Sequence, residues 1–278
     1  MSQTNSQSTI FPVIFVTHGA GPMMFLESSP RPVMGEIDKH SPAAHWFRQL
    51  SKQLSLPSKP KAILVITAHW ETSNIVHINA QQEHSQLFYD YYGFPSEAYE
   101  LKYNPSGDLN LANRIQSLLK QANIPCKLDA ERNFDHGVYI PLKLIYPDAD
   151  IPVVSISILD NLSPNQHLAI GKALSSLRNE EILIIGSGAT VHGFKDNEKQ
   201  QSDTFMNELI NVLTKFNAEE RENILLNWDE KLPYARLNHP REEHLIPLHV
   251  IVGAAGSDSG KWINPNVINT QASFQFGV

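Results

Sequence analysis

Apolar and β-branched residues recur along the chain in short, almost uninterrupted runs. The runs cover residues 10–16, 62–66, 151–158 and 182–185, and a weaker one covers 75–78. Continuous runs of this length are typical of strands that are buried on both faces, as in the parallel sheets of α/β proteins. A further short stretch, residues 273–276, is expected to add a closing edge strand.

Longer stretches with helical spacing of apolar residues lie between these runs. The spacing predicts helices over residues 43–54, 109–122, 139–145, 165–178, 204–216, 218–227 and 241–254. Pro240 just before the last stretch and Gly256 just after it fit the beginning and end of a helix. Alternating strands and helices predict an α/β fold with a central mixed, largely parallel sheet and helices on both faces.

The domain organisation follows from the same pattern. Residues 1–9 are rich in Ser, Gln, Asn and Thr, with neither a basic start nor an apolar stretch, so they are predicted to be a disordered polar tail and not a signal peptide. Residues 10–278 contain no internal repeat or low-complexity linker and are predicted to form a single catalytic α/β domain. A length of 278 residues is near the upper end of what one core supports.

Composition and charge narrow the possible functions. The formal net charge is −7 without a basic stripe, which argues against nucleic acid as a partner. No apolar run approaches the roughly 20 residues that a membrane span requires. Cys126 is the only cysteine, which excludes a disulfide framework and a cysteine-based zinc site. A cytoplasmic location is expected.

Histidines follow three of the predicted strands. His18 comes directly after the first run, His69 after the second, and His192 after the run at 182–185 and a glycine-rich turn. In open α/β sheets, ligands bind beyond the carboxyl ends of the strands, and histidine is the commonest metal ligand. We therefore expect these three histidines, each at a strand end, to share one metal site.

A fourth histidine, His244, is predicted to lie in the first turn of the last helix, next to Glu242 and Glu243. It is a candidate metal ligand, with Glu243 as an alternative donor or as a partner of the ligand. The carboxylates would equally complement the helix dipole, and both roles can hold together. His239 is expected to cap the turn, and His249 is expected to pack in the core.

His136 lies in an Asp-His-Gly segment ahead of an apolar stretch. This segment has two interpretations that spacing alone does not separate: an N-cap turn, or a histidine that acts as acid or base. An aromatic cluster likewise either lines a substrate pocket or packs a loop on the core; its members are Phe88, Tyr89, Tyr91, Tyr92 and Phe94.

The motifs together resemble the class III extradiol ring-cleavage dioxygenases, in the branch typified by 4,5-DOPA dioxygenase extradiol. The resemblance covers nearly the whole chain after the polar tail. It rests on five segments in a fixed order, namely 17–19, 68–70, 134–137, 147–153 and 243–248, and on the tyrosine-rich segment 91–105. The chain departs from the family pattern around Ala20, Gly188, Gly193 and Arg241, which affects the identity of the substrate more than metal binding.

The resemblance implies a set of roles. His18, His69 and His244 correspond to metal ligands. His192 corresponds to a histidine that is either a further ligand or the acid/base beside the metal, and His136 to a second active-site histidine. The resemblance also implies a three-layer α/β fold, one non-haem iron(II) ion in the active enzyme with zinc often present after isolation, and a catechol and O₂ as substrates.

Two other functions remain open from the residues alone. A zinc-dependent hydrolase would use three histidines and a metal-bound water, with Glu243 or Asp135 as the base. A non-catalytic metal-binding scaffold would keep the histidines without turnover. The leading hypothesis is oxygen-dependent ring opening of an L-DOPA-like or related catechol, in which His192 or His136 removes the second phenolic proton.

Overall fold

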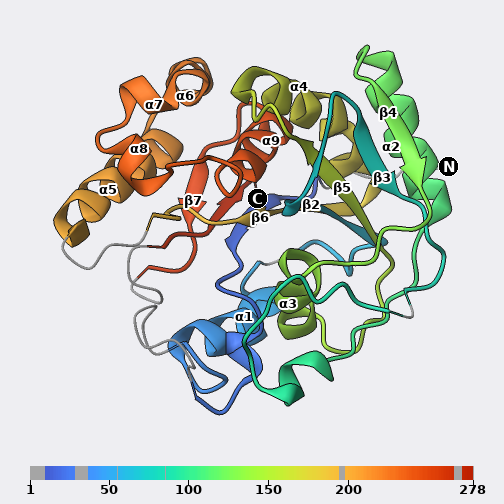
Figure 1. Ribbon diagram of the computed structural model, residues 1–278. Coiled ribbons are helices and arrows are strands. Elements are labelled where there is room, and N and C mark those ends of the chain that lie inside the picture. Colours follow the sequence, from blue (N-terminus) through green and yellow to red (C-terminus); the bar gives the residue numbers. More distant parts are fainter. Residues whose placement is uncertain are drawn as a thin grey trace, which may run out of the picture.

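One mixed sheet forms the centre of the fold (Figure 1). The computed structural model describes residues 10–28, 37–54, 56–84, 86–193, 198–265 and 271–277, and the predicted polar tail lies outside them. Within these residues the sheet has eight strands in the order β4-β3-β5-β2-β6-β1-β8-β7. The strands are β1 Val13–Thr17, β2 Ala62–Thr72, β3 Val76–Asn79, β4 Cys126–Asp129, β5 Val153–Leu159, β6 Ile182–Gly188, β7 Gly260–Trp262 and β8 Phe274–Phe276.

The central strands of the sheet are parallel. Strand β6 pairs in parallel with both β1 and β2, and β2 pairs in parallel with β5. Antiparallel pairing occurs toward the two sides, between β3 and β5 and along β1-β8-β7. The predicted mixed, largely parallel sheet is therefore confirmed. The predicted edge position of residues 273–276 is wrong, because β8 lies between β1 and β7.

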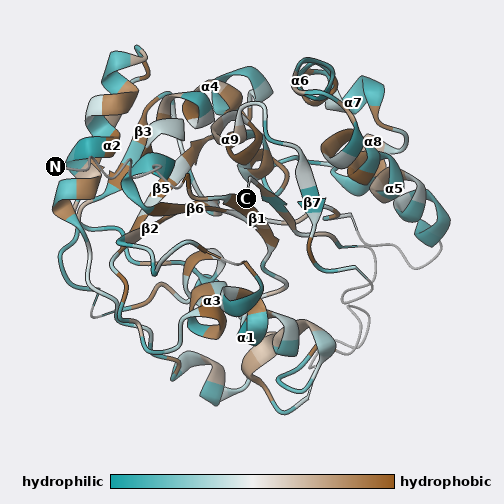
Figure 2. Cartoon of the chain, turned by 180° about the vertical axis from the view of Figure 1, so that it is seen from behind, coloured by the Kyte–Doolittle hydropathy of each residue, from teal (hydrophilic) through white to brown (hydrophobic). Residues whose placement is uncertain are grey.

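Helices cover both faces of the sheet and give three layers (Figure 1). One face carries α1 Pro42–Gln53 and α3 His136–Ile145, whose apolar side chains form one core cluster with Ile14, Val65 and Ile185 of the sheet. The other face carries α2 Leu109–Gln121, α4 Pro164–Leu174, α5 Lys199–Lys215, α6 Ala218–Leu226 and α9 Ile246–Ala255. Figure 2 shows the sheet as the hydrophobic centre between these layers.

Capping residues explain where several helices begin. The hydroxyl of Ser41 accepts a hydrogen bond from Ala44 N, and Pro42 occupies the first turn of α1. Asp108 caps α2 in the same way, and Asn217 and Glu220 form a reciprocal capping box on α6. These helices begin within one or two residues of the predicted positions.

In the part of the chain that the structure describes, six elements fall outside the predicted set because they are too short for a periodic pattern. They are the strands β4 and β7, the single-turn helices α7 Trp228–Lys231 and α8 Ala235–Asn238, and the 3₁₀ helices Met23–Phe25 and Ser96–Tyr99. The predicted helix over 165–178 is divided, since a 3₁₀ helix, Ser175–Glu180, follows α4. Within the described residues no helix combines the length and apolar character needed to cross a membrane.

Candidate metal centre and active site

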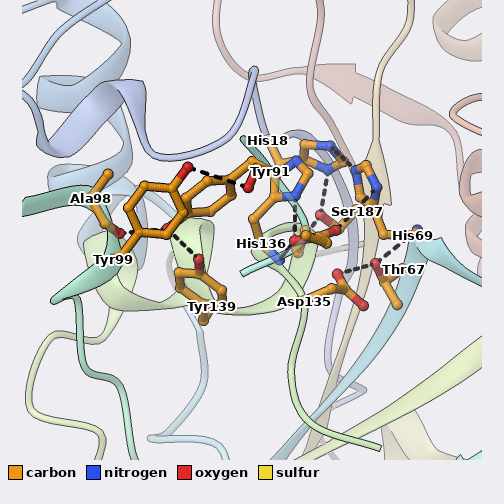
Figure 3. Close-up of polar contacts among 12 residues, drawn as sticks. His18, Thr67, His69, Tyr91, Ala98, Tyr99, Asp135, His136, Tyr139 and Ser187 are labelled. Atoms are coloured by element: carbon orange, nitrogen blue, oxygen red, sulfur yellow. Dashed lines mark hydrogen bonds and ion pairs between the residues drawn. The ribbon is translucent and has the colours of Figure 1, made fainter. Parts of the chain in front are cut away.

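Five histidines from distant parts of the chain come together at the carboxyl ends of the central strands. His18 directly follows β1, His69 lies in β2, His136 is the first residue of α3, His192 follows β6, and His244 precedes α9. Figure 3 shows His18, His69 and His136 directed toward one another. The convergence that the sequence predicted is thus present in the structure.

Two of these histidines lie in different local structures from those predicted. His69 was expected in a turn after a strand, but β2 continues to Thr72. The pairing of β2 with β5 shifts register between Ile66 and Glu71, so His69 lies in an irregular stretch, where a bulge redirects side chains. His244 was expected in the first helical turn, but α9 begins only at Ile246, which leaves His244 in the preceding turn.

Three of the rings form a nearly equilateral triangle. The ring centroids of His18 and His69 are 4.9 Å apart, those of His69 and His244 4.9 Å, and those of His18 and His244 5.4 Å. The Nε2 atoms of His18 and His69 are 3.0 Å apart. Ligands at about 2.0–2.1 Å from one ion lie roughly 3 Å or slightly more from each other. The spacing therefore suits two nitrogens that share a cation.

The hydrogen bonds of Ser187 determine which nitrogen of His18 carries a proton. Ser187 Oγ donates to the carbonyl oxygen of Gly137 at 2.5 Å, so it accepts from Nδ1–H of His18 at 2.9 Å. The Gly137 carbonyl needs this donor because its partner one turn along α3 would be Pro141, which has no N–H. His18 consequently presents an unprotonated Nε2 toward His69.

Two carboxylates hold the remaining histidines by their Nδ1 atoms. Glu243 Oε1 lies 2.8 Å from Nδ1 of His244 and 3.2 Å from Nδ1 of His192. Asp90 Oδ1 accepts from Nδ1 of His136 at 2.8 Å. Ionised carboxylates only accept hydrogen bonds, so each of these rings is protonated at Nδ1 and carries its lone pair at Nε2. Partners of this kind orient metal-binding histidines in general.

Burial keeps the ligand candidates neutral. It lowers the pKa of His18 and of His69 well below the ordinary value of 6.5, and the neighbouring histidines add to the effect. Burial also lowers the pKa of His244 to about 4, against the opposing effect of the Glu243 carboxylate. Neutral imidazole is the form that binds a metal ion. Burial alone would raise the pKa of Glu243, but hydrogen bonds from His192 and His244 hold it well below its ordinary value.

Two separate sets of residues have the spacing of a metal site. Nitrogens of His18, His69 and His136 lie within 4.8 Å of one another, and the same holds for ligand atoms of His192, Glu243 and His244. The centroids of His69 and His136 are only 4.0 Å apart, closer than any side of the His18–His69–His244 triangle. The cluster thus has more histidines than one open metal site needs.

Asp135 is directed away from the histidine cluster (Figure 3). It is fully buried, and its Oδ1 accepts from Thr67 Oγ1 at 2.7 Å, while its Oδ2 lies 3.5 Å from the guanidinium of Arg132. Burial raises the pKa of Asp135. Arg132 in turn donates to the carbonyl oxygen of His69 at 3.0 Å. Asp135 therefore supports the backbone around His69, which does not favour it as the base of a hydrolase.

Three histidines outside the centre, namely His167, His239 and His249, are buried in the core. His249 is buried in α9, as predicted. His239 is the C-cap residue of α8, where its backbone N–H donates to the carbonyl oxygen of Ala235, and its buried ring places Nε2 2.8 Å from the carbonyl oxygen of Thr190. His167 accepts from Leu159 N. Asp90 and Ser187 were not predicted as site residues. Ser187 stood in the glycine-rich turn before His192, and nothing in the local pattern singled it out as a hydrogen-bond partner.

The aromatic cluster divides between core and surface. Tyr91 is buried, and its hydroxyl donates to the carbonyl oxygen of Ala98 and accepts from Tyr139 Oη (Figure 3). Tyr92 is 83% exposed and Phe88 is 44% exposed. Part of the cluster thus packs the loop on α3, as one of the two interpretations proposed.

The chain belongs to an established enzyme family. Residues 12–276 match the family model described as the catalytic LigB subunit of aromatic ring-opening dioxygenase. The family defines the chain as a metal-dependent extradiol dioxygenase, which confirms the activity class expected from the motifs. The family also implies a non-haem metal, in agreement with the histidine cluster.

The chain is also similar to individual curated proteins and to a solved structure. The chain is 37% identical to a 4,5-DOPA dioxygenase extradiol of Beta vulgaris over 91% of this chain and 90% of that one. It is 35% identical to a 4,5-DOPA dioxygenase extradiol-like protein of Schizosaccharomyces pombe over 91% and 87% of the two chains. A solved structure of an uncharacterized Escherichia coli K12 protein matches with a TM-score of 0.71 and 28% identity, covering 96% of this chain and all of that one.

Proposed function

We propose that this protein opens the ring of an L-DOPA-like or related catechol with O₂, at a metal ion bound by Nε2 of His18, His69 and His244. The observation that carries the proposal is the approach of Nε2 of His18 to Nε2 of His69 at 3.0 Å. Because Nε2 of His18 carries a lone pair, this contact needs either a proton on Nε2 of His69 or, as proposed here, a cation that both nitrogens would hold. The resemblance to the family selects the same three histidines.

His192 is proposed to transfer protons and not to bind the metal. Its ring stacks on that of His244 with centroids 3.6 Å apart and an interplanar angle of 18°. A histidine binds a metal through a lone pair in the plane of its ring. Because the two rings are stacked, their in-plane lone pairs lie in separate, nearly parallel planes, so His244 would hold the ion and His192 would not. The His192 side chain is also the more exposed, at 39% against 9%.

The metal, when bound, would supply a Lewis acid for the catechol oxygens and the redox chemistry that activates O₂. The chain's own residues manage position and protons. Nε2 of His192 or of His136 accepts the second phenolic proton of the catechol and returns a proton when the ring opens. Glu243 and Asp90 accept from Nδ1 of the two rings, so the lone pair of each ring is on Nε2, the atom proposed to take the proton.

Iron(II) is the proposed metal of the active enzyme, and zinc is expected after isolation. A nitrogen-rich site binds Zn²⁺ more tightly than Fe²⁺, so the metal found after purification does not identify the active one. The small aromatic substrate and O₂ are the proposed partners. A cytoplasmic location stays a prediction, supported by the single cysteine, Cys126.

Oxygen uptake tests the proposed function. The protein would be loaded with iron(II) without air and then offered L-DOPA, caffeate and protocatechuate in turn, with zinc-loaded protein as the control. We expect uptake that requires iron and produces a coloured ring-opened product with at least one catechol. No uptake with any of them, from protein shown to hold iron, would contradict the proposed substrate class.

A further inference from the structure

Asp90 contacts two histidines of the candidate centre at once. Its Oδ1 accepts from the backbone N–H of His136 at 2.9 Å and from Nδ1 of the same ring at 2.8 Å. Its Oδ2 lies 3.5 Å from Nδ1 of His69. The side chain is only 10% exposed. One carboxylate therefore joins a proposed metal ligand to a histidine that is not in the proposed ligand set.

The segment that carries Asp90 is fixed to the same helix that carries His136. Tyr139 lies three residues after His136, on the same side of α3, and its hydroxyl donates to Tyr91 Oη at 2.8 Å. Phe88 N donates to the carbonyl oxygen of Phe134 at 2.8 Å. These contacts lie on both sides of Asp90 along the chain. The position of the carboxylate relative to α3 is thus determined by several bonds.

We propose that Asp90 is a positioning residue of the ring-opening reaction: it keeps the proton of His136 on Nδ1 and so directs an unprotonated Nε2 toward the metal centre. The inference rests on the proposed function for its catalytic consequence. Asp90 itself does not touch the substrate in this proposal; it acts through His136.

The arrangement repeats on the other side of the centre. Glu243 lies against the proposed ligand His244 and the proton-transfer candidate His192 in the way that Asp90 lies against His69 and His136. Each non-ligand histidine thus has a carboxylate of its own that sets its tautomer. This division separates the two sides of the centre: loss of Asp90 should change His136 and its neighbour His69 and leave His192 as it is.

The tautomer of His136 can be measured directly. Zinc-loaded protein labelled with ¹⁵N in histidine is diamagnetic, and its imidazole nitrogens report which atom carries the proton at a pH above the ordinary histidine pKa of about 6.5. The His136→Gln variant assigns the ring. We expect wild type to show His136 protonated at Nδ1, Asp90→Ala to move the proton wholly or partly to Nε2, and Asp90→Asn to keep it on Nδ1, because the amide oxygen still accepts.

Tyr139→Phe is the matched control. It loosens the same segment by removing the hydrogen bond to Tyr91 but leaves the carboxylate in place. If Tyr139→Phe moves the proton as much as Asp90→Ala does, the effect is a general loosening of the loop and the proposal is wrong. It is also wrong if the Asp90→Ala protein keeps His136 protonated at Nδ1.

Kinetics add a second readout with the iron-loaded enzyme. Asp90→Ala should lower kcat by about 10- to 100-fold, the range for residues that orient an active-site group, with a much smaller change in KM. Asp90→Asn should recover part of kcat. A change in KM with an unchanged kcat would overturn the proposal. If wild type opens no catechol, the proposed function fails, whereas the NMR result still decides whether Asp90 sets the tautomer.

Discussion

Replacement of Ser187 by alanine tests how the chain prepares His18 for a metal ion. The Ser187 side chain is fully buried and joins two groups that have few alternatives: Nδ1–H of His18 and the Gly137 carbonyl, whose helical partner position is taken by Pro141. Ser187→Ala removes both hydrogen bonds without a large change in volume. His18 then loses the bond that keeps its proton on Nδ1.

The size of the effect follows from burial. A buried polar group left without a partner costs about 1–3 kcal/mol, so two such groups should lower the free energy of unfolding by about 2–4 kcal/mol after partial relaxation. Loss of the residue that orients a metal-binding histidine typically weakens metal binding about 10- to 100-fold. In free energy this is about 1.4–2.7 kcal/mol of metal binding.

The assay combines a zinc titration against a chromophoric chelator with thermal unfolding of the metal-free protein. Ser157→Ala is the control, because Ser157 is equally buried on β5 and its hydroxyl contacts Thr72 and His77 instead of a histidine of the centre. Both variants should lose stability, and only Ser187→Ala should lose zinc affinity. Equal zinc affinity in wild type and Ser187→Ala would refute the role of Ser187 in orienting His18.

Three other predictions use different parts of the structure. His244→Ala should lose most of the bound zinc, whereas His192→Ala should keep it and lose turnover; equal zinc loss, measured by atomic absorption, would make His192 a ligand. Burial lowers the pKa of His167 from 6.5 to about 4. Because the unfolded chain takes up the proton first, the free energy of unfolding should fall by about 3 kcal/mol as the pH drops from about 6.5 to about 4. His167→Gln should therefore unfold with a weaker pH dependence over this range in urea titrations. A Cβ on Gly188 would lie 2.1 Å from the carbonyl oxygen of His244, so Gly188→Ala should lower the Tm and the zinc affinity together; an unchanged zinc affinity would show that His244 does not move.

The central part of the fold could be predicted from the sequence because burial on both faces leaves a continuous apolar run. The runs at 62–66 and 182–185 became β2 and β6, which pair in parallel at the centre of the sheet. The strands β4 and β7 could not be predicted in the same way. Residues of β4 are mostly half-buried, and β7 has three residues, too few to show a period of two.

The histidines of the centre could be predicted because parallel strands deliver their carboxyl ends to one edge of the sheet. His18 and His192 follow strands, and this topology brings them together whatever the side chains between them are. The partners of the histidines could not be predicted. Asp90 lies in an irregular segment and reaches His136 across 46 residues, and Ser187 reaches His18 across 169. Such contacts depend on tertiary packing and leave no local pattern.

The most direct test of the central claim is the identity of the product formed from the best catechol by the iron-loaded enzyme. Cleavage beside the diol leaves an aldehyde and a carboxylate in a product that keeps every ring carbon, whereas cleavage between the two hydroxyl carbons leaves two carboxylates. We predict that mass spectrometry and NMR will show the aldehyde, together with oxygen atoms from ¹⁸O₂. A dicarboxylate, or a product without label from ¹⁸O₂, would contradict extradiol cleavage by this protein.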